Sequence, residues 1–173
     1  NRIEEGLFVV EGEKNVEELL DSNFQILDIY ATDEWLVDVE HIKVSSKDLG
    51  RITSLSTPNK VLALVKIPIS NSINLGITSL VIDGVNDPGN LGTIIRTANW
   101  FGIKQIICSG NSVDKFTPKV IMASMGSIFK TDVIYTDLHQ FLLDSKLPVY
   151  GALLKGESIF NSKINSPCCF LLG

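Results

Sequence analysis

The stretch from Asp83 to Ala98, which reads DGVNDPGNLGTIIRTA, holds the residue types and spacing best suited to chemistry. Gly84, Gly89 and Gly92 let the backbone approach a ligand closely, and a helix that starts among them presents free N–H groups to an anion. Arg96 lies further along that helix and adds a permanent cation. These features favour a site for a phosphate-bearing ligand, whereas a solvated surface arginine is the ordinary alternative.

Two common phosphate-binding motifs do not fit this turn. Gly84 and Gly89 have the glycine spacing of a P-loop, but Asn90-Leu91 stands where a P-loop has lysine followed by serine or threonine. The dinucleotide fingerprint needs one residue between its first two glycines, and here four residues separate them. A nucleoside triphosphatase and a Rossmann dinucleotide enzyme are therefore disfavoured.

A strand, a turn and a helix must position these residues. Leu80–Ile82 is typical of a strand buried on both faces, and residues 83–89 have the composition of a tight turn. We expect Asn90 to be the N-cap of the helix and Gly102 to end it in a left-handed conformation. At 100° per residue the helix has an apolar stripe and an opposite polar face. The stripe consists of Leu91, Ile94, Ile95, Ala98 and Phe101, and the polar face of Thr93, Arg96, Thr97 and Trp100.

Residues Asp87 to Ala98 resemble, nearly letter for letter, the first signature motif of the SpoU (TrmH-like) family of RNA ribose 2′-O-methyltransferases in the SPOUT superfamily. The resemblance implies methyl transfer from S-adenosylmethionine to a ribose 2′-hydroxyl. It also implies that Arg96 is catalytic and contacts RNA, with Asn90 as its positioning partner. Deprotonating a free arginine near neutral pH would cost on the order of 7 kcal/mol. This cost favours a cation that orients the substrate phosphate over a general base, although either role predicts activity loss without Arg96.

The chain after residue 77 predicts a mainly parallel sheet with helices on both faces, in the order β-α-β-α-β-α-β-β. Ligands bind at the carboxyl ends of such strands. The expected strands are Leu80–Ile82, Gln105–Cys108, Asp132–Tyr135, Val149–Leu154 and Cys168–Leu172, and the later helices are Thr117–Gly126 and Asp137–Ser145. By the resemblance, S-adenosylmethionine binds to Gly151, Ala152, Leu153, Leu172 and Gly173.

The resemblance also implies a deep trefoil knot. The chain stops at Gly173, before the Asn-Glu-Gly continuation of the second motif and before the third motif with its Ser-Leu-Asn. It begins at Asn1 rather than at methionine. We therefore expect a piece of a longer polypeptide, in which the C-terminal part of the knot and most of the cofactor pocket are missing.

A second segment, residues 114–129, resembles the Pro-Lys-Val and Ala-Ser-x-Gly segment of the family. Lys115 and Lys119 are expected to contact RNA phosphates, with a solvated loop and helix start as the even alternative. Met122 stands where members commonly carry an arginine, which puts that arginine's contact in doubt.

Residues 1–66 alternate strands and helices and predict a small α/β sandwich. Phe8–Gly12 and Val61–Val65 resemble the ribosomal-protein-like substrate-binding domain of the family, and Glu11 is expected at its RNA surface. Residues 67–77 have the composition of a linker, which leaves 78–173 as the methyltransferase domain. The expected strands are Leu7–Val10, Ile26–Ala31, Ile42–Val44 and Val61–Val65, and the helices are Glu13–Ser22 and a helix capped by Ser45 and Asp48 that runs to about Leu55.

The two parts of the chain differ in net charge. Residues 1–75 carry 7 basic and 13 acidic residues, a net charge of −6, while residues 76–173 carry 8 and 7, a net charge of +1. An acidic first domain argues against a simple phosphate-tracking RNA binder.

The rest of the composition argues against a membrane-spanning protein, a metal site and a catalytic histidine. A 45% hydrophobic and 20% charged chain is ordinary for a globular protein, and no apolar run reaches the length of a membrane span. Cys108, Cys168 and Cys169 lack zinc spacing and suggest a reducing, cytoplasmic setting. His41 and His139 are isolated, so we expect no metal site and no catalytic histidine.

Three hypotheses follow. The leading one is a homodimeric RNA 2′-O-methyltransferase that acts on RNA, ribosomal rather than transfer RNA. The second is a non-catalytic RNA-binding module, which holds if the protein truly ends at Gly173. The third is a nucleotide- or phosphate-metabolite enzyme that uses the glycine-rich turn as an anion cradle.

Overall fold

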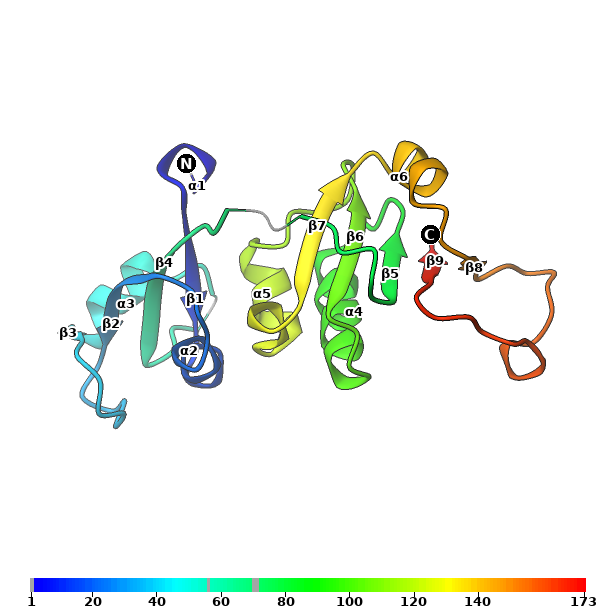
Figure 1. Cartoon of the computed structure of the whole chain (residues 1–173). Coiled ribbons are helices and arrows are strands. Elements are labelled where there is room, and N and C mark those ends of the chain that lie inside the picture. The colour runs from blue at the N-terminus through cyan, green and yellow to red at the C-terminus, as the bar shows by residue number, and fades with distance from the viewer. Residues whose placement is uncertain (1, 56, 70–71) are drawn as a thin grey trace.

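The computed structural model describes residues 2–55, 57–69 and 72–173. The chain forms two halves, each built on its own sheet (Figure 1). Asn1, and Ser70 and Asn71 of the expected linker, lie outside the described residues. The α/β class is confirmed, whereas the domain boundaries and the knot stay predictions.

The N-terminal half is a four-stranded sheet in the order β1-β4-β2-β3. Strand β4 lies antiparallel to β1 and β2, and β3 lies parallel to β2. The strands confirm the predicted pattern with shifts of one residue at their ends. The elements are α1 Arg2–Glu5, β1 Leu7–Glu11, α2 Glu13–Leu20, β2 Ile26–Ala31, β3 Ile42–Lys43, α3 Ser46–Ile52 and β4 Val61–Lys66.

Helix α3 begins as expected but ends three residues early. Ser45 is the N-cap, and its hydroxyl accepts the Asp48 backbone N–H at 3.1 Å. The helix stops at Ile52 rather than Leu55 because Thr53 and Ser54 turn toward a buried carboxylate on β1.

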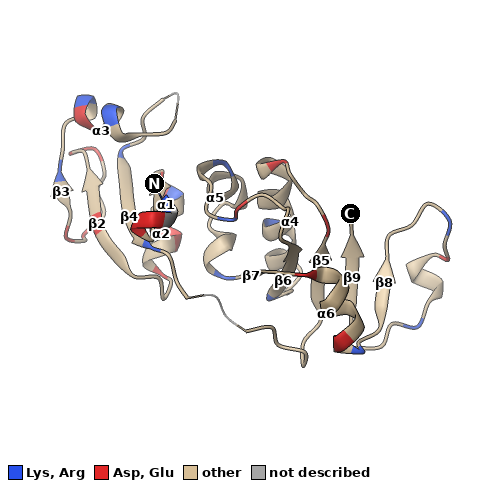
Figure 2. Ribbon diagram, turned by 90° about the horizontal axis from the view of Figure 1, so that it is seen from above, with Lys and Arg blue, Asp and Glu red and all other residues tan. Residues whose placement is uncertain are grey.

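The C-terminal half is a five-stranded, fully parallel sheet in the order β7-β6-β5-β9-β8. Helices α4 and α5 cover one face, and α6 lies on the other (Figure 2). Strand β8 ends at Gly151, three residues before the expected end. The elements are β5 Ser79–Ile82, α4 Pro88–Trp100, β6 Gln105–Ser109, α5 Pro118–Ser124, the 3₁₀ turn η1 Ser127–Phe129, β7 Asp132–Thr136, α6 Leu138–Ser145, β8 Val149–Gly151, the 3₁₀ turn η2 Ile159–Asn161 and β9 Cys169–Leu172.

Helix α4 begins earlier than predicted. Its N-cap is Asp87, whose carboxylate accepts the Asn90 N–H at 2.8 Å, so the expectation that Asn90 is the cap is wrong. Pro88 at the first helical position explains the shift, because its fixed φ suits a helix start and its missing N–H needs no partner there. Gly102 has the expected left-handed φ of 77°. Phe101 is 76% exposed, so its assignment to the apolar stripe is also wrong.

One hydrophobic core runs through both halves. The rings of Phe8 on β1 and Phe116 after β6 stack with centroids 4.3 Å apart, and Phe24 meets Phe129 edge to face at 5.3 Å. These aromatic contacts join elements of the N-terminal half to the loops around α5. The two halves therefore share buried hydrophobic packing across their junction, which the sequence did not predict.

Candidate functional site

The turn between β5 and α4 lies at the carboxyl end of the central strand of the C-terminal sheet. Gly84 has a φ of 68°, which glycine adopts without strain, and its N–H donates to the Ser109 hydroxyl at 2.8 Å. The Val113 N–H donates to the Val85 carbonyl at 2.9 Å. The turn is therefore held in place by the loop that follows the neighbouring strand β6.

Charged groups fix the first turn of α4. The hydrogen bond from the Asn90 backbone N–H lowers the pKa of Asp87, and the nearby Lys119 ammonium lowers it further. Lys119 Nζ lies 3.6 Å from the Asp87 carboxylate. Lys119 thus reaches the motif from α5 and pairs there with Asp87, while its contact with an RNA phosphate stays a prediction.

Arg96 and Asn90 are both exposed on α4. Among the described residues Arg96 has no hydrogen-bond or ion-pair partner. The neighbouring Thr93 and Thr97 hydroxyls donate to the backbone carbonyls of Gly89 and Thr93, each at 2.8 Å. The guanidinium is therefore an uncommitted donor group on this face of the helix.

The five residues expected to bind cofactor lie at the same edge of the sheet as the turn. Parallel register pairs Ile82 with Leu172 and Gly151 with Leu171, so β9 links the turn to the end of β8. Gly173 packs against the turn so closely that a Cβ there would lie 3.2 Å from the Asp83 carbonyl oxygen. Ala152 donates its N–H to the Leu171 carbonyl at 3.0 Å, and Leu153 is 77% exposed.

Glu11 and Lys115 point into the protein. Glu11 is only 5% exposed, and its carboxylate accepts hydrogen bonds from the Thr53 hydroxyl and from the Ser54 N–H. Lys115 donates to the Val133 carbonyl on β7, and burial lowers the pKa of its ammonium group. Their roles as RNA contacts stay predictions, and their geometry gives both side chains structural partners instead.

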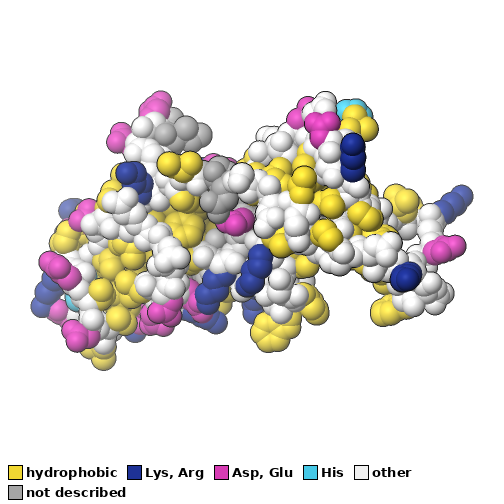
Figure 3. All heavy atoms as spheres, viewed as in Figure 1, with side chains coloured by type: hydrophobic (Ala, Val, Ile, Leu, Met, Phe, Trp, Pro, Cys, Tyr) yellow, Lys and Arg dark blue, Asp and Glu magenta, His cyan; other side chains and the backbone are white. Residues whose placement is uncertain are grey.

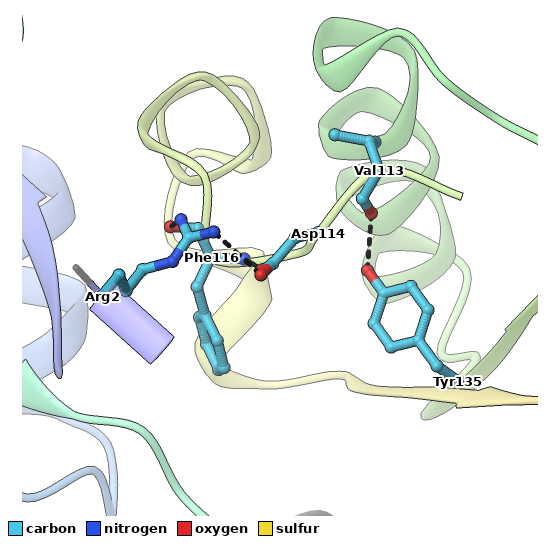
Figure 4. A network of polar contacts seen from close by, with 5 residues as sticks. All are labelled: Arg2, Val113, Asp114, Phe116 and Tyr135. Carbon is cyan, nitrogen blue, oxygen red and sulfur yellow. Dashed lines mark hydrogen bonds and ion pairs between the residues drawn. The ribbon is translucent and has the colours of Figure 1, made fainter. Parts of the chain in front are cut away.

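A network that the sequence did not suggest ties the first half to the loop beside the turn (Figure 4). Arg2 donates to the Asp114 carboxylate at 2.8 Å and to the Phe116 carbonyl, and the Tyr135 hydroxyl donates to the Val113 carbonyl at 2.7 Å. Burial raises the pKa of Tyr135 well above its usual value, so the phenol remains a donor. Sequence reasoning missed these partners because Arg2 and Asp114 are 112 residues apart.

Two family models match this chain. Residues 77–173 match the model of the SpoU rRNA Methylase family, and residues 1–63 match the MRM3-like substrate binding domain. The chain belongs to the SpoU rRNA methylase family. The family resemblance seen in the motif Asp87 to Ala98 is thereby confirmed.

SpoU-related proteins align along much of the chain. It is 29% identical over 163 residues to the 23S rRNA (guanosine(2553)-2′-O)-methyltransferase RlmP of Bacillus subtilis, covering 89% of this chain and 65% of RlmP. It is 33% identical over 110 residues to the mitochondrial rRNA methyltransferase 3 of Mus musculus, covering 57% of this chain and 26% of that protein. The chain thus spans less than two thirds of each of these relatives.

Solved structures share the whole arrangement of elements. A protein from Porphyromonas gingivalis assigned to the TrmH family superposes with a TM-score of 0.88 at 32% identity, covering 99% of this chain and 74% of that one. The AdoMet-bound rRNA methyltransferase from Sinorhizobium meliloti gives a TM-score of 0.82 at 27% identity, covering 99% and 72%. The relative placement of the two sheets is therefore a feature shared with these proteins.

This SpoU-family chain departs from the usual pattern at Met122, whose sulfur accepts a hydrogen bond from the Asn15 side chain at 3.3 Å. The position therefore faces α2 of the N-terminal half. In the described part of the chain, no group of three or more His, Cys, Asp or Glu residues could hold a metal ion. Within the same ranges, no helix is long and apolar enough to cross a membrane.

Proposed function

We propose that the protein is an RNA 2′-O-ribose methyltransferase that uses S-adenosylmethionine and acts on ribosomal RNA. The observation that carries the proposal is Arg96, exposed and without a partner among the described residues, on the helix that opens with the family motif. The names of RlmP and of rRNA methyltransferase 3 support ribosomal RNA as the substrate.

S-adenosylmethionine would be held where the turn, β9 and β8 meet. Gly151, Ala152 and Leu153 are exposed there, and Gly173 provides a surface without a side chain directly beside Asp83. This open, mostly apolar wall fits a nucleoside approached by backbone atoms. When bound, the cofactor supplies the activated methyl group. Leu172 would contribute through its carbonyl, which already accepts the Asp83 N–H at 2.9 Å and so aligns β9 with the turn.

Arg96 would act as a fixed cation rather than as a base. A guanidinium is a permanent cation, so Arg96 can hold a substrate phosphate and stabilise the negative charge that develops on the 2′-oxygen. Asn90, about 1.7 turns earlier on α4, is also exposed and would position the ribose by hydrogen bonding. Both side chains are free to reorient toward RNA because no described residue occupies their polar groups.

The first prediction tests this role. Replacing Arg96 with alanine should lower the rate of methyl transfer by about 10²- to 10³-fold, because a donor that stabilises developing charge is lost. The assay measures transfer of labelled methyl groups from S-adenosylmethionine to a ribosomal RNA fragment by the full-length protein.

Arg51→Ala serves as the matched control, since Arg51 is an exposed arginine on α3 whose ion pair with Asp48 adds little stability. Thermal unfolding should be unchanged in both variants. An Arg96→Ala protein that methylates at the parent rate would refute the assignment.

We further propose a homodimer in a reducing cytoplasmic compartment. Trp100 and Phe101 at the end of α4 are 84% and 76% exposed and would suit a subunit interface. Cys108, Cys168 and Cys169 are free and buried, which supports a compartment that keeps thiols reduced.

A further inference from the structure

A cavity of about 650 Å³ opens where the two halves meet. It is bordered by the start of β2, the end of β4 with the residues that follow it, and the edge strand β7. Its volume lies within the range of sites that hold small ligands. The turn that carries the methyl-transfer motif contributes no residue to its lining.

The charge of the cavity is opposite to that of the chain. Four lysines and one aspartate line it, although the whole chain has a net charge of −5. Two of the lysines are engaged, Lys115 with the Val133 carbonyl and Lys130 with Glu18. Lys66 and Lys104 are exposed, and within residues 2–55, 57–69 and 72–173 no carboxylate forms an ion pair with either. The cavity therefore presents two available cations.

The wall of the cavity is apolar and aromatic. Phe24, Phe116 and Phe129 lie in edge-to-face contact, with Phe24 centroids 6.3 Å from Phe116 and 5.3 Å from Phe129. Phe24 is only partly buried, so part of its ring faces the cavity. Thr131 also lines the cavity, and its buried hydroxyl has no hydrogen-bond partner among the described residues. A ligand here meets an apolar surface, a spare hydroxyl and two lysines.

We propose that this cavity binds an unpaired nucleotide, with its base against Phe24 and its phosphate near Lys66 and Lys104. A flat ring beside a phosphate matches an aromatic wall beside two cations, the combination by which proteins hold single-stranded nucleic acid. The source of the nucleotide rests on the proposed function: it is a second nucleotide of the RNA that is methylated.

The position of the cavity separates it from methyl transfer. Lys104 and Thr131 directly precede β6 and β7 and lie at the amino ends of the strands. The motif turn lies at the opposite, carboxyl end of the same sheet. Lys and Arg side chains lie along the junction of the two halves on the face seen in Figure 3. A substrate strand would thus contact the cavity outside the reacting nucleotide, and an acidic N-terminal half would still bind RNA at its border.

The test is equilibrium binding of a fluorescent single-stranded uridine decanucleotide to the full-length protein without S-adenosylmethionine. The double variant Lys66→Gln, Lys104→Gln should bind about tenfold more weakly. Its plot of log affinity against log salt should flatten by about 1.4, because two phosphate contacts are lost. Lys155→Gln removes an exposed lysine from the loop after β8, far from the cavity, and should bind as the parent does. Equal weakening in the double variant and the control, or in neither, would overturn the proposal.

A second measurement locates the contact and identifies its source. An oligonucleotide containing 4-thiouridine should crosslink under ultraviolet light to peptides that contain Phe24 or Ile67, and crosslinks found only elsewhere would contradict the proposal. Uridine 5′-monophosphate should compete only at far higher concentration than the oligonucleotide if an RNA strand is the ligand. Competition by the free nucleotide at equal concentration would instead assign the cavity to a mononucleotide.

The outcomes separate this proposal from the proposed function. Arg96→Ala should lower methyl transfer by about 10²- to 10³-fold and keep the crosslink in the cavity. A protein that methylates normally but shows no dependence on Lys66 and Lys104 would remove the subsite and leave the enzyme assignment intact. Binding in the cavity without any methyl transfer would support the subsite and contradict the enzyme assignment.

Discussion

At the scale of single residues, partners far apart in sequence decide which charged side chains are available. Glu11 meets Thr53 and Ser54 across more than 40 positions, and Lys115 meets Val133 on the edge strand. Lys115 thereby covers a backbone carbonyl of an edge strand, a common use of lysine, while its contact with RNA stays a prediction. Arg96 was predictable because its exposure follows from helical periodicity alone.

Asp87 gives a residue-scale prediction about pH. Because hydrogen bonding and Lys119 lower the pKa of its carboxyl in the folded protein, its stabilising contribution is fully present above the unfolded value near 4 and is lost as the pH falls through the folded value. Asp87→Ala should therefore lower the melting temperature at pH 7, and the difference from the parent should shrink on acidification toward pH 3.

Circular dichroism melts of both proteins across this pH range measure the effect. Asp38→Ala is a suitable comparison, since Asp38 is exposed, lies outside the helices and forms no ion pair among the described residues. A melting-temperature difference for Asp87→Ala that stays constant with pH would contradict the role of the ionised carboxylate.

At the scale of elements, most of the fold could be predicted from hydrophobic periodicity and cap residues. Every expected strand and helix is present, because short apolar runs and turn residues determine them locally. Element ends were less predictable. Strand β8 stops at Gly151, earlier than the apolar run suggests. Helix α4 starts at Pro88 because the Asp87 cap and proline geometry outweigh the simple pattern there.

The packing of α4 on α5 gives an element-scale prediction. A Cβ on Gly92 would lie 2.5 Å from the Ala123 Cβ and 2.7 Å from the Val120 carbonyl oxygen. The backbone of α5 would have to shift to make room for this Cβ. Gly92→Ala should therefore lower the free energy of unfolding by about 1–3 kcal/mol, despite the better helix propensity of alanine.

Urea unfolding followed by tryptophan fluorescence gives this free energy. Gly156→Ala is the control, because a Cβ at Gly156 meets no atom within 4 Å and its backbone does not need a positive φ. Equal stability of the Gly92→Ala protein and the parent would contradict this prediction, because it would show that α4 and α5 can shift to accommodate the added methyl group.

At the scale of the whole molecule, packing and polar contacts join the two halves across their junction. The aromatic core crosses the junction, and Arg2 binds the loop whose Val113 N–H holds the motif turn. Composition predicts a linker at residues 67–77, but composition reveals local preferences and not contacts between distant segments, so the packing across the junction could not be predicted. The same junction creates the lysine-lined cavity, which periodicity could not indicate.

Arg2 therefore gives a prediction at this scale. Arg2→Ala should increase amide hydrogen exchange in residues 110–117, including Val113, because the loop loses its anchor in the N-terminal half. Exchange in β1 and β4 should stay as in the parent. Hydrogen exchange measured by mass spectrometry resolves these segments. Unchanged protection of the loop would show that contacts within the C-terminal half are enough to keep it in place.

We propose that the turn before α4 guides methyl transfer to a ribose 2′-oxygen. The most direct measurement is mass spectrometry of the nucleosides from ribosomal RNA incubated with the full-length protein and S-adenosylmethionine. We predict a single 2′-O-methylated nucleoside that is absent from the Arg96→Ala reaction. A methyl group on a base, or no methylated nucleoside from any ribosomal RNA, would contradict the account.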